Sequence, residues 1–301
     1  MFPIITVPPD AADLIEQLGT KQKFWYDDTA GERRLFKQVR QDTGEDWSEK
    51  VASELGTLLG LPHADYDFAT WKDLRGVVTP TFVPDRGRLV LGNELLVRLD
   101  SGYPGARAFR VRQHTLRLVL AVLRAPMVTA PLGWTPIQDV VTGLDVFAGY
   151  VLLDAWIGNT DRHHENWGLV LSADQTVPLA PTYDHASSLG RNESDISRRE
   201  RLTTRDQGRS VTRYVERTTS SFFGADSTKP LSTQDAFGAT ARAIPAAAKV
   251  WLDRLAGVSS ADTLRIFEEV PPTLITAPAI EFAQRMLELN QQRLLLLGSS
   301  L

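Results

Sequence analysis

The first 90 residues carry short apolar segments separated by turns, a pattern typical of strands. Residues 23–28 (KFWYDD) and 33–40 (RRLFKQVR) are rich in aromatic and apolar side chains, and the glycine of the intervening TAGE suits a hairpin turn. Residues 64–71 (ADYDFATW) and 75–84 (RGVVTPTFVP) have the same character, with a polar turn between them. We predict four strands here.

One amphipathic helix interrupts this series at residues 46–62 (DWSEKVASELGTLLGLP). Asp46 or Ser48 is the predicted N-cap, and Gly60 and Pro62 are typical of a helix end. The apolar positions at helical spacing predict the buried stripe: Trp47, Val51, Leu55, Leu58 and Leu59.

Beyond residue 90 the pattern changes to long apolar stretches. Residues 115–126 and 144–158 are apolar on most sides and predict buried helices. WGLVLS (167–172) and VPLAPTYD (177–184) flank a polar ADQT and predict a hairpin, and residues 234–299 return to amphipathic helices.

These patterns predict an α+β fold with two lobes. A small β-rich N-lobe, residues 1–90, precedes a larger, mostly helical C-lobe, residues 91–301. Asp, Gly and Pro gather within 84–106, so we place the boundary in that range.

Composition narrows the class of protein. The chain of 301 residues has a formal net charge of −4, which argues against direct binding of nucleic acid by bulk charge. It contains no cysteine, which excludes disulfides and thiolate metal sites. The first residues lack the pattern of a signal peptide, and no apolar run reaches the roughly 18 residues of a membrane span. We therefore expect a soluble cytoplasmic protein with no membrane partner.

Polar residues follow the apolar stretch 144–158 at a spacing used for phosphoryl transfer. Asp161 and Asn166 have the spacing Asp-x-x-x-x-Asn of the protein-kinase catalytic loop, and Asp184 follows the second hairpin strand. Phosphoryl transfer needs hard oxygen ligands for Mg²⁺ and a carboxylate near the attacking hydroxyl. We predict Asp161 as the catalytic residue, with Asn166 and Asp184 as Mg²⁺ ligands.

A cation for the phosphates is expected from the N-lobe. Lys37 lies on a predicted strand after two large apolar residues, and Glu49 or Glu54 of the following helix is its predicted partner. Further phosphate-binding candidates lie in the segment LGTKQKF before the first strand: Gly19, Lys21 and Lys23.

The motifs IGNTDRHHENWGLV (157–170) and LAPTYDHASSLG (179–190) resemble the signature of HipA-like serine/threonine kinases. GTKQKF, LFK and the 46–62 helix are similar to that family's phosphate loop, nucleotide lysine and glutamate-bearing helix. The similarity covers about residues 17–190.

The resemblance implies a kinase-related fold that uses ATP and Mg²⁺ and phosphorylates Ser or Thr of a protein. It implies Asp161 as catalytic aspartate, Asn166 and Asp184 as metal ligands, Lys37 as the ATP lysine and Glu49 as its partner. The chain departs from the family in that barely 20 residues precede the predicted phosphate loop, so we expect a short, stand-alone member without the family's extra N-terminal subdomain. Autophosphorylation, a toxin role and an antitoxin partner are the corresponding hypotheses.

Two other functions fit the same residues. One is a small-molecule phosphotransferase of the aminoglycoside- or lipid-kinase type, and the other is a non-catalytic ATP-binding pseudokinase. All the expected polar groups are present, which favours an enzyme.

Two features have more than one interpretation. Residues 191–217 hold eight arginines among many Ser and Thr, and they predict a solvated surface, an acceptor- or phosphate-binding surface, or an activation-type segment. His163 and His164 could suggest zinc, but adjacent histidines in a loop are more often structural.

Overall fold

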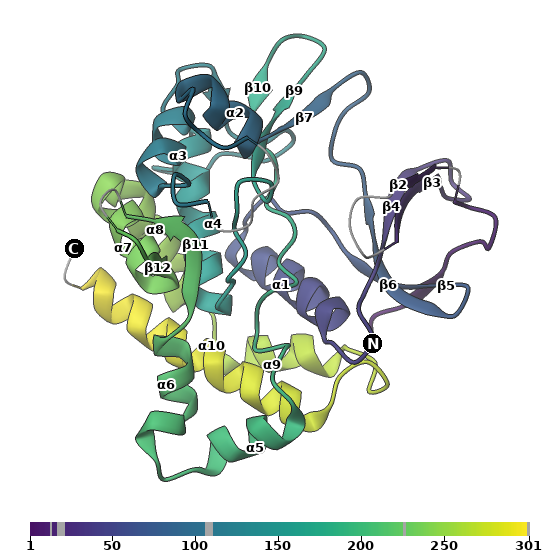
Figure 1. The fold of residues 1–301 in the computed structure, drawn as a ribbon, viewed down its shortest axis with the longest axis vertical. Helices are drawn as coiled ribbons and strands as arrows, with labels where there is room; N and C mark the ends of the chain where they lie inside the picture. The colour runs from purple at the N-terminus through teal and green to yellow at the C-terminus, as the bar shows by residue number, and fades with distance from the viewer. Residues whose placement is uncertain (13, 17–21, 106–110, 225–226, 300–301) are drawn as a thin grey trace.

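A computed structural model of the protein describes residues 1–12, 14–16, 22–105, 111–224 and 227–299. It confirms the α+β fold, with a small strand-rich lobe beside a larger, mostly helical lobe (Figure 1). The exact boundary between the lobes stays a prediction.

A six-stranded sheet makes up most of the small lobe. Its strands are β1 (Ile4–Thr6), β2 (Leu14–Glu16), β3 (Lys23–Asp27), β4 (Arg33–Gln38), β5 (Asp67–Trp71) and β6 (Leu74–Pro80). Their order is β1-β5-β6-β4-β3-β2, in which β1 runs parallel to β5 and the other neighbours are antiparallel. The four predicted strands are present as β3, β4, β5 and β6.

Alternation along β3 explains the core of this sheet. Phe24 and Tyr26 are buried while their neighbours are more exposed, as expected for a strand with one covered face. The Phe24 ring centroid lies 4.7 Å from that of Trp71 and 5.1 Å from that of Phe36. These aromatic contacts join three strands.

Helix α1 (Glu45–Leu59) connects the sheet to the large lobe. The predicted caps are wrong, because Gly44 is the N-cap and makes no side-chain cap. Asp46 instead pairs with Arg75 of β6, and Ser48 donates to the carbonyl of Ser188 at 3.1 Å. Tertiary partners therefore take both side chains away from capping.

The far end of α1 follows the sequence prediction. Gly60 adopts the left-handed conformation, with φ 70°, that favours glycine after a helix. Trp47, Val51, Leu55 and Leu59 are buried as predicted. Leu58, also predicted to be buried, is exposed.

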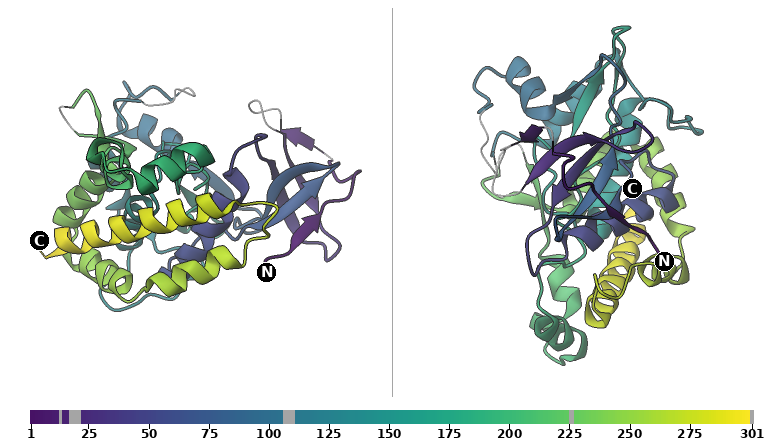
Figure 2. Two further views of the ribbon diagram at one scale, coloured as in Figure 1. Left: turned by 90° about the horizontal axis from the view of Figure 1, so that it is seen from below. Right: turned by 90° about the vertical axis from the view of Figure 1, so that its right-hand side faces the viewer.

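The large lobe contains the remaining elements. In chain order they are β7 (Arg88–Leu91), α2 (Gly92–Leu99), α3 (Leu116–Leu123), β8 (Val128–Thr129), α4 (Gly143–Ile157), β9 (Gly168–Leu171), β10 (Val177–Pro178), α5 (Asp195–Thr203), η1 (Gln207–Arg209), α6 (Val211–Glu216), β11 (Thr219–Phe223), β12 (Pro230–Ser232), α7 (Thr233–Ala243), α8 (Pro245–Ala256), α9 (Ser260–Glu268) and α10 (Ala277–Gly298). Figure 2 shows α10, in yellow, running the length of this lobe.

Helix α4 is the central, buried helix of the large lobe. A capping box between Thr142 and Asp145 starts it, and Gly158, with φ 67°, ends it. Nearly all of its residues are buried, and it packs against α7, α8 and α10. The predicted buried helix is thus confirmed, and it provides a rigid base for the loop that follows.

Within the described ranges, no helix has both the length and the apolar character needed to cross a bilayer.

The predicted hairpin is correct only in outline. The chain reverses between Ser172 and Thr176, whose N–H and carbonyl form a 3.1 Å hydrogen bond. However, β9 pairs with β7 and β10 pairs with β8, and a single bridge joins Leu169 to Leu179. The strands β9 and β10 therefore form most of their backbone pairing with β7 and β8, and little with each other.

Candidate active site

The loop after α4 begins with a network that holds Asp161. The backbone N–H and the side-chain amide of Asn159 both donate to Asp154, each at 2.8 Å. The Asn159 side-chain oxygen then accepts from the backbone N–H of Asp161 at 3.1 Å. Because Asp154 lies in the last turn of α4, the helix sets the position of Asp161.

Arg162 anchors the middle of the loop from inside the protein. Its Nε and Nη2 donate to the two carboxylate oxygens of Asp154, both at 2.7 Å. Its Nη1 donates to the carbonyl of Asn166 at 2.8 Å. The Arg162 side chain is 1% exposed and that of Asp154 is 5% exposed. Paired donors of this kind fix geometry, so the ion pair holds the loop in one conformation.

Asn166 closes the loop back onto Asp161. Its Nδ2 donates to the backbone carbonyl of Asp161 at 2.7 Å. Only the NH₂ end of an amide can donate to a carbonyl, so this contact identifies the other end as the oxygen. Asn166 therefore presents an oriented amide oxygen, which suits a Mg²⁺ ligand.

The Asp161 carboxylate is more accessible than its surroundings, with 43% of the side chain exposed. Its Oδ2 accepts a long hydrogen bond of 3.5 Å from the Ser187 hydroxyl. Burial of the site raises the pKa of Asp161, and the charge of Asp184 raises it further, while His163 and Arg191 oppose the shift. The two carboxylates are thus close enough for their charges to interact.

Asp184 follows β10 in an unusual backbone conformation. Its φ of 59° lies in the left-handed region, which aspartate tolerates better than most residues. Its N–H donates to the Tyr66 hydroxyl at 3.3 Å. Burial alone would raise the pKa of Asp184, but Lys37 and Lys23 hold it well below its usual value. Asp184 is therefore ionised at neutral pH.

Lys37 of β4 contacts two carboxylates, one on α1 and one in the loop after β10. Its Nζ lies 3.0 Å from Asp184 Oδ1 and 3.4 Å from Glu49 Oε2. Burial would lower the pKa of Lys37, but Asp184 and Glu49 raise it well above its usual value. The lysine is therefore a fixed positive charge.

The structure distinguishes the two glutamates left open by the sequence. Glu49 is 1% exposed, contacts Lys37, and accepts from the backbone N–H of His185 at 2.6 Å. Glu54 is 28% exposed and pairs with Lys50 at 2.6 Å. Only Glu49 of the two is placed to orient Lys37.

Lys23 lies beside Lys37 on the neighbouring strand. The two residues are cross-strand partners in the β3–β4 register. Like charges in this position destabilise a strand pair unless an anion lies between or above them. The pair therefore suits a phosphate-binding position. The other two phosphate-loop candidates, Gly19 and Lys21, lie outside the described residues.

The histidines serve the architecture of the loop. His164 is buried, and its Nδ1 lies 2.6 Å from the Tyr103 hydroxyl. His185 contacts Thr182 Oγ1 at 2.7 Å and Arg162 Nη2 at 3.1 Å, and burial lowers its pKa well below the usual value. In the part of the chain that the structure describes, no three histidine or carboxylate residues form a cluster suited to a metal ion.

Sequence reasoning missed three contributors to the site. The Asp154–Arg162 pair had one signal, an acid near the end of a mostly apolar helical run. Tyr66, whose ring lies 5.6 Å from Lys37 Nζ, had none. Ser187 also had none, because its approach to Asp161 depends on how two loops meet.

No family model matches the sequence, and no curated protein matches it. Among solved structures, the Helicobacter pylori proinflammatory kinase CtkA matches with a TM-score of 0.71 and 20% identity, over 99% of this chain and 98% of that chain. Shewanella oneidensis MR-1 HipA, solved with HipB and its operator DNA, matches with a TM-score of 0.57 and 11% identity, over 96% and 67%. This chain has a HipA-like kinase fold. The predicted fold is therefore confirmed, while identities this low leave the activity to be argued from the site.

Proposed function

We propose that the protein is an ATP- and Mg²⁺-dependent phosphotransferase, and specifically a HipA-like protein serine/threonine kinase. The observation that carries this proposal is the position of Lys37 between Glu49 and Asp184, next to the loop that presents Asp161. A fixed cation, an ionised carboxylate and an accessible second carboxylate are the groups that phosphoryl transfer needs.

Each residue has a separate role in this proposal. Lys37 and Lys23 bind the phosphates of ATP, and Glu49 orients Lys37. Asn166 and Asp184 would hold Mg²⁺, which neutralises charge on the phosphates when bound. Asp161 accepts a hydrogen bond from the acceptor hydroxyl and aligns it. The oriented amide of Asn166 and the low pKa of Asp184 support the metal assignment.

The surroundings of Asp161 favour a protein over a cationic small molecule. Four arginines line a cavity beside it, which disfavours an aminoglycoside acceptor. An antitoxin partner, a toxin role, autophosphorylation and a cytoplasmic location stay predictions from the sequence.

The test combines labelled ATP with the substitution Asp161→Asn. Wild-type protein is incubated with Mg²⁺ and ATP labelled on the γ-phosphate, alone and with a cell lysate, and mass spectrometry identifies the modified residues. We expect phosphoserine or phosphothreonine in the lysate proteins. Asp161→Asn should lower transfer at least about 100-fold, because a general base contributes about 10²–10⁴-fold. ATP affinity should stay within about twofold.

Two outcomes would contradict the proposal. Undiminished transfer by Asp161→Asn would remove the aspartate from catalysis. ATP binding by the wild-type protein without any turnover would identify a pseudokinase.

A further inference from the structure

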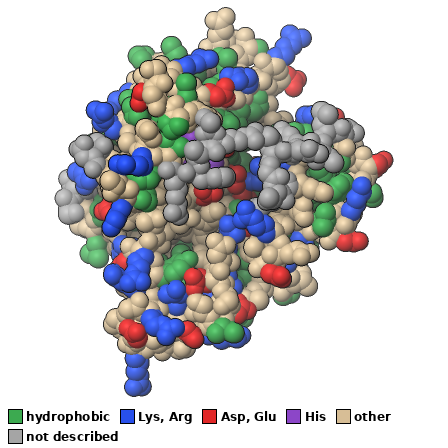
Figure 3. All heavy atoms as spheres, in the orientation of Figure 1, with side chains coloured by type: hydrophobic (Ala, Val, Ile, Leu, Met, Phe, Trp, Pro, Cys, Tyr) green, Lys and Arg blue, Asp and Glu red, His purple; other side chains and the backbone are tan. Residues whose placement is uncertain are grey.

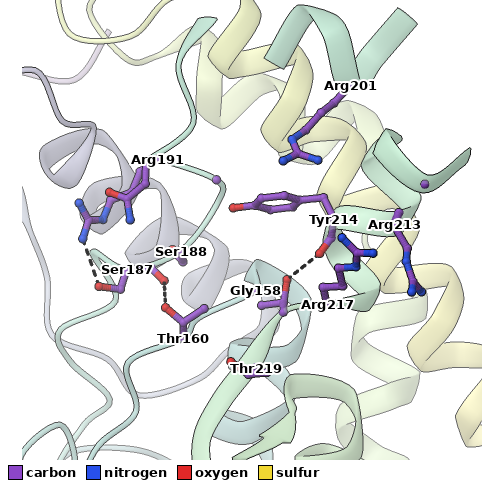
Figure 4. A pocket seen from close by; sticks show the side chains of 14 residues that line it. Gly158, Thr160, Ser187, Ser188, Arg191, Arg201, Arg213, Tyr214, Arg217 and Thr219 are labelled. Atoms are coloured by element: carbon purple, nitrogen blue, oxygen red, sulfur yellow. Dashed lines mark hydrogen bonds between the residues drawn. The ribbon is translucent and has the colours of Figure 1, made fainter. Parts of the chain in front are cut away.

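A cavity of about 260 Å³ lies beside Asp161, between the loop after Asp184 and helix α6 (Figure 4). Thr160, the neighbour of Asp161, and Ser187 both line it. The Ser187 hydroxyl also donates to Asp161 at 3.5 Å. A group bound in this cavity therefore lies close to the acceptor hydroxyl that Asp161 would align.

Arginines from three segments surround this cavity. Figure 4 shows Arg201 and Arg217 on either side of Tyr214, and Arg191 with its guanidinium directed away from Tyr214, toward Ser187. Arg213 also belongs to the lining. In Figure 3, basic side chains with acidic ones between them cover the surface over α5 and α6. The arginines of the 191–217 segment that line this cavity are thus the ones close to Asp161.

Arg191 lines the cavity and is only partly satisfied by its neighbours. Its Nη2 donates to the Ser187 hydroxyl at 3.3 Å, and its Nη1 lies 3.2 Å from Glu45 Oε1. Within the described ranges, its buried Nε has no hydrogen-bond partner, while Nη1 is occupied by the ion pair with Glu45. Buried donors without partners are rare in folded proteins, and a bound water or ion is one of the explanations for such a group.

The other arginines differ in how far they are already paired. Arg201 pairs with Glu193 at 2.9 Å, and Arg213 pairs with Glu216 at 2.9 Å. For Arg217, neither an ion pair nor a side-chain hydrogen bond exists with the residues that the structure describes. Arg217 is exposed and lines the cavity, so its guanidinium is available to a ligand.

We propose that this cavity binds a phosphate group on the protein substrate, so that the enzyme prefers a Ser or Thr near a phosphoserine or phosphothreonine. This inference rests on the proposed kinase function. A phosphate carries three strong acceptor oxygens and nearly two negative charges, so it suits a cavity lined by several arginines better than one carboxylate does. A peptide spans about 3.3–3.6 Å per residue, so the phosphorylated residue lies one or two positions from the acceptor.

The test uses fluorescent peptide pools with one fixed acceptor serine in random sequence. The three pools carry phosphoserine, glutamate or serine two positions from the acceptor, on either side. Binding is measured by anisotropy at constant salt, with Mg²⁺ and a non-hydrolysable ATP analogue. We expect the phosphoserine pool to bind the wild-type protein at least about tenfold more tightly than the serine pool, as charge-assisted hydrogen bonds allow.

Two substitutions distinguish phosphate binding in the cavity from non-specific attraction by the positive charge of the segment. Arg217→Gln should abolish most of the preference for phosphoserine. Arg205→Gln is the matched control, because Arg205 is an exposed arginine of the same segment that does not line the cavity. It should keep the wild-type preference. Equal losses in the two variants would show attraction by bulk charge and overturn the proposal.

Transfer to the same pools, followed with labelled ATP, distinguishes the two proposals. Equal binding and equal transfer for the serine and phosphoserine pools would reject the phosphate site and leave the kinase function intact. Arg217-dependent binding without transfer to any pool would reject the kinase function and support the site. If a phosphorylated sugar alcohol, and not the peptide, binds in an Arg217-dependent way, the peptide substrate is wrong.

Discussion

The buried ion pair between Asp154 and Arg162 allows a quantitative test of how the catalytic loop is held. We predict that Asp154→Asn strongly destabilises the protein. The substitution keeps the size of the side chain but removes its charge, so the Arg162 guanidinium stays buried without a counter-ion. Both charge-assisted hydrogen bonds of 2.7 Å are weakened or lost at the same time.

The expected magnitude follows from burial. Because both side chains are almost completely buried, water cannot replace the lost carboxylate. Removing one partner of a buried pair costs about 3–5 kcal/mol. Domains are stable by about 5–15 kcal/mol in total, so this is a large fraction of the free energy of unfolding.

Urea unfolding, followed by circular dichroism, measures this free energy. The control is Asp253→Asn, which removes the acid of the Lys249–Asp253 pair on α8. That pair has a similar separation of 2.6 Å, but its side chains are 74% and 65% exposed. An exposed pair contributes about 0.5 kcal/mol or less. If the two substitutions lower the free energy of unfolding equally, burial is not the reason that the Asp154–Arg162 pair stabilises the protein.

Two further predictions concern activity and pH. Glu49→Gln should lower kcat/KM by about 100-fold, because it releases Lys37 from its position, whereas Glu54→Gln should change it less than about twofold; steady-state kinetics on one substrate compares them, and equal effects would reject the assignment of Glu49. Burial lowers the pKa of His114 to about 3, so the unfolded state binds one more proton than the folded state from pH 6.5 down to about 3. The free energy of unfolding should therefore fall with decreasing pH in this window, by up to about 1.4 kcal/mol per pH unit from this residue. His114→Gln should flatten that slope in urea titrations, and an unchanged slope would show that His114 is not the group responsible.

Local sequence signals determined the elements that carry the site. The apolar run 144–158 predicts helix α4, and the structure adds the Thr142–Asp145 capping box that begins it and Gly158 that ends it. Two short apolar-aromatic segments joined by a glycine-containing turn predict β3 and β4, which place Lys23 and Lys37 side by side. The spacing of Asp161, Asn166 and Asp184 indicates the chemistry. These signals work because apolar runs, turns and motif spacing depend on residues only a few positions apart.

Only the tertiary structure decided which side chains meet. Periodicity could not choose between Glu49 and Glu54, because both lie near the edge of the same helix face, and the choice depends on where β4 packs. Ser48, a predicted cap, instead bonds to Ser188, 140 positions away. The cavity beside Asp161 likewise forms only when Arg191 and Arg217 approach from separate segments. Such contacts depend on the packing of the whole chain, so no local pattern in the sequence predicts them.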